Sequence, residues 1–241
     1  MPSESRAPSG PASAEIHRTT RICTSLSGRT CLELAEKARE ALAKGTDLVE
    51  FRIDLLRPIV TDEIRSKLSG FSGRSVFTVR PTAEGGGFDG KESQRLALIR
   101  RLAELRPAYF DVELRTLEAA PGLASERLGE NIIVSWHDLV RTPGRARLLS
   151  IMSRAAHHGG LSKVVTTASS STDNLTVLSL YDEPGPAPIA FCMGAEGLFS
   201  RVMAMERSSP IAYASLAGER TAQGQLPLDY MLAIRRRLGA D

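Results

Sequence analysis

The chain has 241 residues, of which 42% are hydrophobic and 24% charged, and its net charge at pH 7 is +3. No run of about eighteen apolar residues is present, so we expect no transmembrane helix. So small a positive surplus does not indicate a nucleic-acid or membrane partner. The three cysteines, Cys23, Cys31 and Cys192, lack CxxC spacing. Neither a disulfide framework nor a zinc site is therefore expected, and free thiols suit a cytoplasmic protein.

Residues 1–18 are rich in Ser, Pro and Ala and show no apolar periodicity. They lack the apolar core of a signal peptide. We expect a disordered tail, because such a segment buries too little apolar surface to offset its ordering entropy. Residues 19–241 are expected to form one domain.

From Arg21 onward, short β-rich runs alternate with segments of helical periodicity. The expected strands span residues 21–26, 47–53, 75–80, 108–114, 131–136, 162–168, 187–193 and 211–215. The expected helices include residues 30–44, 91–105, 143–157, 172–182, 195–207 and 225–238. Such alternation predicts a parallel sheet covered by helices, an α/β fold. Eight units favour a single (β/α)₈ TIM barrel over an open doubly wound sheet, for which no early GxGxxG is present.

Several expected strands carry polar side chains on one face, although strands of a parallel sheet are usually apolar on both. An edge strand with a solvated face would explain this, but a closed barrel has no edge. We therefore expect these side chains to point into the barrel mouth, where active sites of this fold lie. They are Glu50, Arg52, Asp54, Thr78, Arg80, Tyr109, Asp111, Glu113, Ser135, His137 and Lys163.

Lys163 lies within the apolar run SKVVTTA. Its amine either extends to solvent or is buried, and a buried amine points to imine formation with a carbonyl substrate. His137 is equally compatible with a core histidine and a general base. We assign no function to His157 and His158.

Two glycine-rich segments follow strands. Residues 80–90 contain Glu84 and Asp89, which would repel phosphate, so a mobile loop is the better interpretation. Residues 193–197 contain Glu196, which also disfavours an anion there. Arg201, in the next helix, is either a surface charge or a carboxylate anchor.

With these residues in view, the chain resembles the type I 3-dehydroquinate dehydratases (3-dehydroquinases) of the shikimate pathway, from about Arg21 to Leu238. The matching strings, in chain order, are TSLSGRT, EFRIDLL, TVRPTAEGG, FDVEL, IIVSWHD..RTP, SKVVTTASSSTDNLTVL, MG..G.FSRV and TAQGQL. Each string is weak alone, whereas their joint order and spacing are highly specific.

The resemblance implies a (β/α)₈ barrel, generally a homodimer, that uses no metal or organic cofactor. Lys163 would form a Schiff base with the C3 ketone of 3-dehydroquinate. His137 would act as base and then acid in a syn elimination, and Glu84 would tune that histidine. Arg201 would anchor the substrate carboxylate. The other implied substrate-binding residues are Ser25, Glu50, Arg52, Arg80, Met193, Tyr213, and Thr221 and Gln225 of a closing loop.

Three positions depart from the family's usual pattern. The closing loop has Gln223 where Pro is common, Phe191 replaces the first Met of Met-x-Met-Gly, and Tyr213 stands where Phe is common. These changes bear on substrate binding and leave Lys163 and His137 in place.

Two other functions stay open. A ligand-sensing regulator on the same fold would be free to lose the lysine or the histidine, and this chain has both. Another imine-forming lyase or aldolase acting on a phosphosugar would need an anion cradle after the last strands, which Glu196 disfavours.

Overall fold

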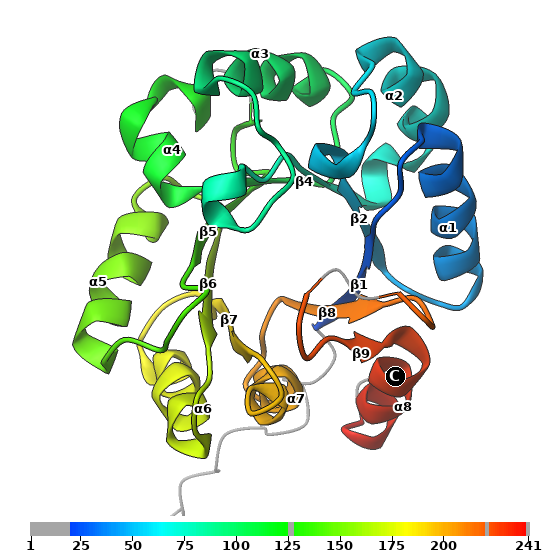
Figure 1. Ribbon diagram of the computed structural model, residues 1–241. Helices are drawn as coiled ribbons and strands as arrows, with labels where there is room; N and C mark the ends of the chain where they lie inside the picture. The colour runs from blue at the N-terminus through cyan, green and yellow to red at the C-terminus, as the bar shows by residue number, and fades with distance from the viewer. Residues whose placement is uncertain (1–19, 125–127, 220–221, 240–241) are drawn as a thin grey trace, which may run out of the picture.

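The computed structural model describes residues 20–124, 128–219 and 222–239, which form a ring of strands surrounded by helices (Figure 1). The strands are β1 (Arg21–Leu26), β2 (Leu48–Arg52), β3 (Ser75–Thr78), β4 (Tyr109–Glu113), β5 (Ile132–His137), β6 (Leu161–Thr167), β7 (Ile189–Met193), β8 (Ile211–Ser215) and β9 (Leu226–Pro227). The α-helices are α1 (Cys31–Ala43), α2 (Thr61–Leu68), α3 (Glu92–Ala103), α4 (Leu114–Ala119), α5 (Arg145–Ala156), α6 (Ser171–Leu178), α7 (Leu198–Glu206) and α8 (Leu228–Arg237). Short 3₁₀ helices are η2 (Ile53–Leu55), η3 (Ser69–Arg74), η4 (Thr82–Glu84) and η6 (Ser179–Asp182).

Local sequence fixes the ends of these elements. The Thr30 side chain accepts a hydrogen bond from the backbone of Glu33 at the start of α1. Gly45, just after α1, has a φ of +98°, which glycine adopts without strain. At α6, Ser170 and Asp173 form a capping box.

All strand pairs are parallel, and the sheet order is β7-β6-β5-β4-β3-β2-β1-β8-β9. The predicted barrel is confirmed, but its ladder is not continuous. Among the described residues, β7 pairs only with β6, while β8 pairs with β1 and the short β9. β7 and β8 therefore face each other without a ladder between their described residues, and we call this place the β7–β8 junction. The rings of Phe191 and Tyr213 pack across it with centroids 6.2 Å apart.

The core has two parts. Apolar side chains pack between the strands and the outer helices, including Phe51, Phe77 and Phe110, whose rings meet edge to face across β2, β3 and β4. A second cluster fills the barrel interior and includes Leu48 and Ile133. These two residues lie early in β2 and β5, and polar side chains follow on the same face. The interior is therefore apolar near the strand starts and polar toward their C-terminal ends.

The helices α2 and α4 have no counterpart in the sequence-based prediction. Helix α2 has two buried apolar residues, Ile64 and Leu68, too few to show a period. Helix α4 starts directly after Glu113, inside the run predicted as strand. Residues 226–227 form β9, so α8 begins later than expected. In the described part of the chain, no helix combines the length and apolarity needed to cross a membrane. The predicted tail, residues 1–18, lies outside the described residues.

Candidate active site

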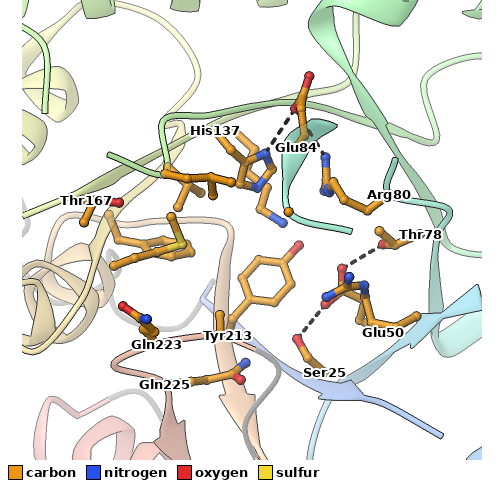
Figure 2. Close-up of a pocket in the computed structure, with 18 of the residues that line it drawn as sticks. Ser25, Glu50, Thr78, Arg80, Glu84, His137, Thr167, Tyr213, Gln223 and Gln225 are labelled. Atoms are coloured by element: carbon orange, nitrogen blue, oxygen red, sulfur yellow. Dashed lines mark hydrogen bonds and ion pairs between the residues drawn. The ribbon is translucent and has the colours of Figure 1, made fainter. Parts of the chain in front are cut away.

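The C-terminal ends of the strands surround a cavity of about 370 Å³ (Figure 2). Eleven of the twelve site residues expected from sequence line it, and the twelfth, Thr221, lies outside the described residues. The eleven are Ser25, Glu50, Arg52, Arg80, Glu84, His137, Lys163, Met193, Arg201, Tyr213 and Gln225. Residues that are far apart in the chain therefore meet in one place, as a barrel mouth requires.

Lys163 extends from β6 into this cavity, with only 6% of its side chain exposed. Its Nζ donates a hydrogen bond to Oδ2 of Asp111 at 2.8 Å and lies 4.1 Å from the ring centroid of Tyr213. The alternative of an amine that reaches bulk solvent is therefore wrong. Because β5 and β6 place Ser135 opposite Lys163, the next inward position on β5, His137, lies one step further toward the mouth.

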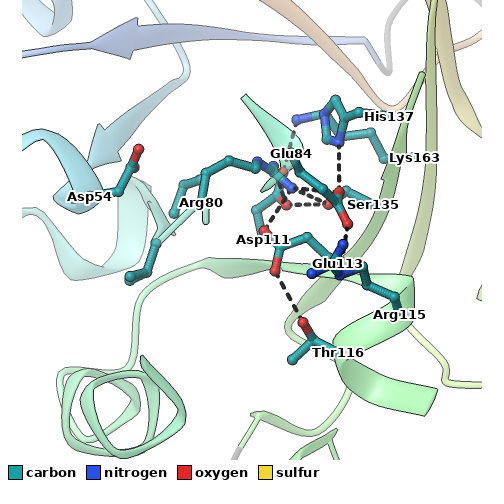
Figure 3. A network of polar contacts seen from close by, with 12 residues as sticks. Asp54, Arg80, Glu84, Asp111, Glu113, Arg115, Thr116, Ser135, His137 and Lys163 are labelled. Carbon is teal, nitrogen blue, oxygen red and sulfur yellow. Dashed lines mark hydrogen bonds and ion pairs between the residues drawn. The ribbon is translucent and has the colours of Figure 1, made fainter. Parts of the chain in front are cut away.

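Arg80 and Asp111 form the centre of a buried charge network (Figure 3). The Arg80 guanidinium donates to Asp111 at 2.7 Å, to Glu113 at 2.8 Å and to the Ser135 hydroxyl at 2.9 Å. Burial opposes ionisation of Asp111, but the charges of Arg80 and Lys163 hold its pKa well below the usual range. The Lys163 ammonium therefore faces a carboxylate that stays charged throughout the neutral range.

The network continues outward to Arg95 of α3, whose side chain is 1% exposed. Arg95 donates to Glu113 at 2.7 Å, to the carbonyl of Val79 at 2.8 Å and to Glu92 and Thr116. Buried charges are tolerated when they are paired and hydrogen-bonded. This chain of contacts thus ties α3 to the Arg80 side chain in the cavity.

His137 and Glu84 lie side by side at the mouth. Nδ1 of His137 is 3.7 Å from Oε2 of Glu84, and neither atom has a hydrogen-bond partner among the residues that the structure describes. Burial, and then the charges of Arg80 and Lys163, lower the pKa of His137 well below its usual value, so its imidazole is neutral at pH 7. Burial, and then the charge of Glu113, raise the pKa of Glu84 to about 7. The mouth thus holds a neutral imidazole beside a carboxyl group that titrates near neutral pH.

The wall formed by β1, β2 and β3 presents fixed polar groups. Glu50 accepts hydrogen bonds from Ser25 at 2.5 Å and from Thr78 at 2.7 Å. Arg52 makes two hydrogen bonds with Asp54, at 2.9 and 2.7 Å. These contacts hold both site residues in place without a ligand.

The glycine-rich loop after β3 packs tightly against this wall. Asp54 accepts a hydrogen bond from the backbone of Gly87 at 2.8 Å. A Cβ at Gly86 would lie 2.0 Å from the carbonyl oxygen of Arg80, and one at Gly87 would lie 2.7 Å from that of Asp54. The glycines of this loop therefore allow close backbone approach, which positions Glu84.

The wall at the β7–β8 junction is different. Arg201 of α7 is 5% exposed, and its guanidinium lies 4.4 Å from the ring centroid of Phe191. It donates to the carbonyl of Gln223 at 3.0 Å, while its Nε has no hydrogen-bond partner in the described part of the chain. No ion pair joins Arg201 to a carboxylate within the described residues. Burial lowers the pKa of Arg201 to about 10. A buried cation of this kind has the chemistry to bind an anionic group.

Tyr213 and the loop before β9 complete this wall. The Tyr213 hydroxyl is buried without a partner, and burial, and then the charge of Glu50, raise its pKa well above the usual value. Gln225 donates from its side chain to the carbonyl of Ala214 at 2.9 Å. Gly224 packs so closely that a Cβ there would lie 2.3 Å from the carbonyl oxygen of Gly194. The loop before β9 is thus fastened to both sides of the junction.

Comparison with known proteins agrees with this geometry. The family model for Type I 3-dehydroquinase matches residues 22–240. The chain belongs to the type I 3-dehydroquinase family.

Its relatives cover most of the chain. The 3-dehydroquinate dehydratase of Pyrobaculum aerophilum is 40% identical over 206 residues, which are 85% of this chain and 66% of that protein. The one of Pyrococcus abyssi is 34% identical over 212 residues, 86% of this chain and 96% of that protein. The crystal structure of the Geobacillus kaustophilus 3-dehydroquinate dehydratase superposes with a TM-score of 0.82 at 24% identity, covering 91% of each chain. The resemblance found in the sequence is therefore confirmed at the level of family and fold.

Some residues of this 3-dehydroquinase site were not identified as site residues from sequence. Asp111 was expected to face the barrel mouth, but its contact with Lys163 crosses 52 positions of the chain and depends on strand register. Arg95 lies on α3 in phase with the buried Ile99 and Leu102, so its helical position was the signal that could have identified it. Arg115 of α4 approaches Glu84 from outside the cavity, with Nε 3.5 Å from Oε1.

Proposed function

We propose that this protein is a 3-dehydroquinate dehydratase, a lyase that removes water from 3-dehydroquinate and releases 3-dehydroshikimate. The observation that carries the proposal is the Lys163 amine, buried in the cavity of a member of this family. A neutral imidazole at His137 and an unpaired guanidinium at Arg201 supply the other groups that the reaction needs.

The chemistry would proceed through an imine. The Lys163 amine, after giving up a proton, attacks the C3 ketone, and the resulting carbinolamine loses one water to form a protonated imine. This imine acidifies the C2 proton, which His137 removes. His137 then returns a proton to the C1 hydroxyl, which leaves as the second water in a syn elimination. One water hydrolyses the imine and regenerates the lysine, so the net reaction releases one water.

The other lining residues would bind and orient the substrate. Arg201 matches a substrate carboxylate, because a guanidinium presents two donors in one plane. Glu50, Arg52 and Arg80 would contact the ring hydroxyls, together with Ser25. Glu84 would adjust the charge and orientation of His137.

Four further residues belong to the same proposal. Met193 and Tyr213 would pack against the substrate ring. Gln225, with Thr221 in its loop, would close over the substrate and exclude water.

We also propose a cytoplasmic homodimer. Leu175 of α6 and Leu198 and Phe199 of α7 are exposed apolar side chains. The starts of these two helices are joined, because Asn174 donates to the carbonyl of Glu196 and accepts from the backbone amide of Ser200. An apolar surface of this kind suits a second copy of the chain.

The decisive experiment mixes purified protein with 3-dehydroquinate and follows the ultraviolet absorbance of the conjugated product. Borohydride added during turnover should reduce the imine and leave a stable mass increase on the peptide containing Lys163. Lys163→Ala should abolish both signals. Lys44→Ala removes an exposed lysine that pairs with Glu40, so it is a matched control expected to keep both.

Other outcomes point to the alternatives. Full activity in Lys163→Ala without an adduct would remove the imine mechanism. Ligand binding without turnover in the wild-type protein would favour a ligand-sensing regulator. Turnover of a phosphosugar in place of 3-dehydroquinate would favour an aldolase.

A further inference from the structure

Glu84 lies between two groups of charges. Its side chain is 9% exposed, and its two oxygens face different partners. Oε2 is 3.7 Å from Nδ1 of His137 and 4.0 Å from Nη1 of Arg80, whereas Oε1 is 3.5 Å from Nε of Arg115 (Figure 3). The Glu84 carboxylate is therefore held between His137 and Arg80 on one side and Arg115 on the other.

Two arginines near Glu84 favour its charged form, and the rest of its surroundings oppose it. Burial and the nearby carboxylates Glu113 and Asp111 oppose ionisation, while Arg80 and Arg115 favour it. Arg80 already donates to Asp111, Glu113 and Ser135. Arg115 forms no other ion pair within the described residues.

The position of Arg115 separates it from substrate binding. It lies in the first turn of α4, its side chain is 61% exposed, and it does not line the cavity. Its direct contact with a residue that lines the cavity is the one with Glu84, to which its guanidinium is directed.

We propose that Arg115 is a positioning residue that keeps the Glu84 carboxylate charged and turned toward His137 during proton transfer. The proposal rests on the dehydratase function proposed above. A charged Glu84 stabilises the imidazolium that forms when His137 takes the substrate proton. A protonated Glu84 lacks that effect.

The pH dependence follows from the sign of this interaction. The pKa of Glu84 is about 7, so activity should fall as the pH falls through that value and Glu84 becomes protonated. Without Arg115 the pKa rises further, which moves this acidic limb to higher pH. Because the guanidinium is mostly exposed and partly screened, we expect a shift of at most about 0.7 pH unit.

The test compares Arg115→Gln with wild type across pH 5.5–9.5. We expect kcat to fall by about 2–5-fold at pH 6 and to change little at pH 9, with KM for 3-dehydroquinate unchanged. Arg115→Lys, which keeps the positive charge, should restore most of the profile. Arg154→Gln removes an exposed arginine of α5 that pairs with Glu118 of α4 and should leave the profile unchanged.

A second measurement does not depend on turnover. The carboxyl ¹³C resonance of Glu84, assigned by its loss in Glu84→Gln, should titrate at higher pH in Arg115→Gln than in wild type. High salt should raise the wild-type midpoint and leave that of Arg115→Gln in place, because it screens the exposed guanidinium.

These readouts separate the two proposals. An unchanged Glu84 midpoint, or a shift equally produced by Arg154→Gln, would overturn the role of Arg115 whether or not the protein is a dehydratase. A shifted midpoint in a protein without dehydratase activity would support the Arg115–Glu84 interaction and overturn its catalytic use.

Discussion

The two sides of the cavity handle charge in opposite ways. On the side of β2 to β6, Asp111 pairs with Arg80 and Lys163, Glu113 pairs with Arg80 and Arg95, and Glu50 accepts hydrogen bonds from two hydroxyl groups. At the β7–β8 junction, Arg201 packs against Phe191 and contacts a backbone carbonyl, and it forms no ion pair with a carboxylate of the described residues. The carboxylates of the first side are satisfied by protein groups, whereas we expect the second side to receive its counter-charge from a ligand.

This contrast separates stability from binding. Removing one member of a buried, paired set leaves its partners charged and unsatisfied, so the fold loses stability. Removing a buried cation that has no acid partner relieves a desolvation cost, so the fold should not suffer. The sharpest tests therefore change one charge on each side and measure both stability and activity.

The largest effect on the fold is expected from Asp111→Asn. Arg80 and Lys163 would then face a neutral amide in a buried site, and the free energy of unfolding should fall by about 3–5 kcal/mol. Urea denaturation measures this loss. The matched control is Asp182→Asn, which removes an exposed partner of Arg207 and should cost less than about 1 kcal/mol. Equal losses of stability in Asp111→Asn and Asp182→Asn would contradict the contrast between the two sides of the cavity.

Arg201→Met should lower activity without lowering the stability of the fold. Losing two charge-assisted hydrogen bonds to the substrate carboxylate should lower kcat/KM by about 100-fold, mainly through KM. The free energy of unfolding should stay the same or rise, because Met keeps the contact with Phe191 and removes a desolvated charge. Steady-state kinetics and urea denaturation of the same samples measure both. Arg145→Met, at an exposed pair with Glu183, should change neither, and a large loss of stability in Arg201→Met would contradict the contrast.

The smallest effect is expected from Tyr213→Phe. Its hydroxyl has no partner, so the change should alter the free energy of unfolding by less than about 0.5 kcal/mol and leave the ring over Lys163 in place. KM for 3-dehydroquinate should rise no more than about 5-fold. By contrast, Tyr181→Phe removes a hydroxyl that contacts both backbone groups of Ala190, and should cost about 1–2 kcal/mol. A loss of similar size in Tyr213→Phe would show that its hydroxyl has a partner.

The sequence predicted those features of the fold and the site that follow from the periodicity of side chains along strands and helices. The alternation in β2 and β4 placed Glu50 and Asp111 inside the barrel, and the β-α rhythm identified the fold. The position of Lys163 followed from the same phase argument. These features are local, because side-chain direction along a strand repeats every two residues.

Features that depend on register or on small differences in packing were not predictable. The contact of Lys163 with Asp111 depends on the relative register of three strands. Arg115 was not identified as a site residue because α4 starts inside a run that resembles strand. The interruption between β7 and β8 has no sequence signal, since both strands have ordinary β-rich sequences. The direction in which Arg201 points could not be decided without the helix that carries it.

The interruption of the ladder at the β7–β8 junction bears on how this site can change during evolution. Elsewhere in the barrel, backbone hydrogen bonds fix the spacing of neighbouring strands at about 4.8 Å, so inward side chains have little freedom of size. Between β7 and β8, packed side chains and not a backbone ladder set the distance between the strands. The three departures from the family pattern, Phe191, Tyr213 and Gln223, all lie at this junction or in the loop fastened to it. New substrate preferences can therefore accumulate at these positions while the rest of the barrel stays the same.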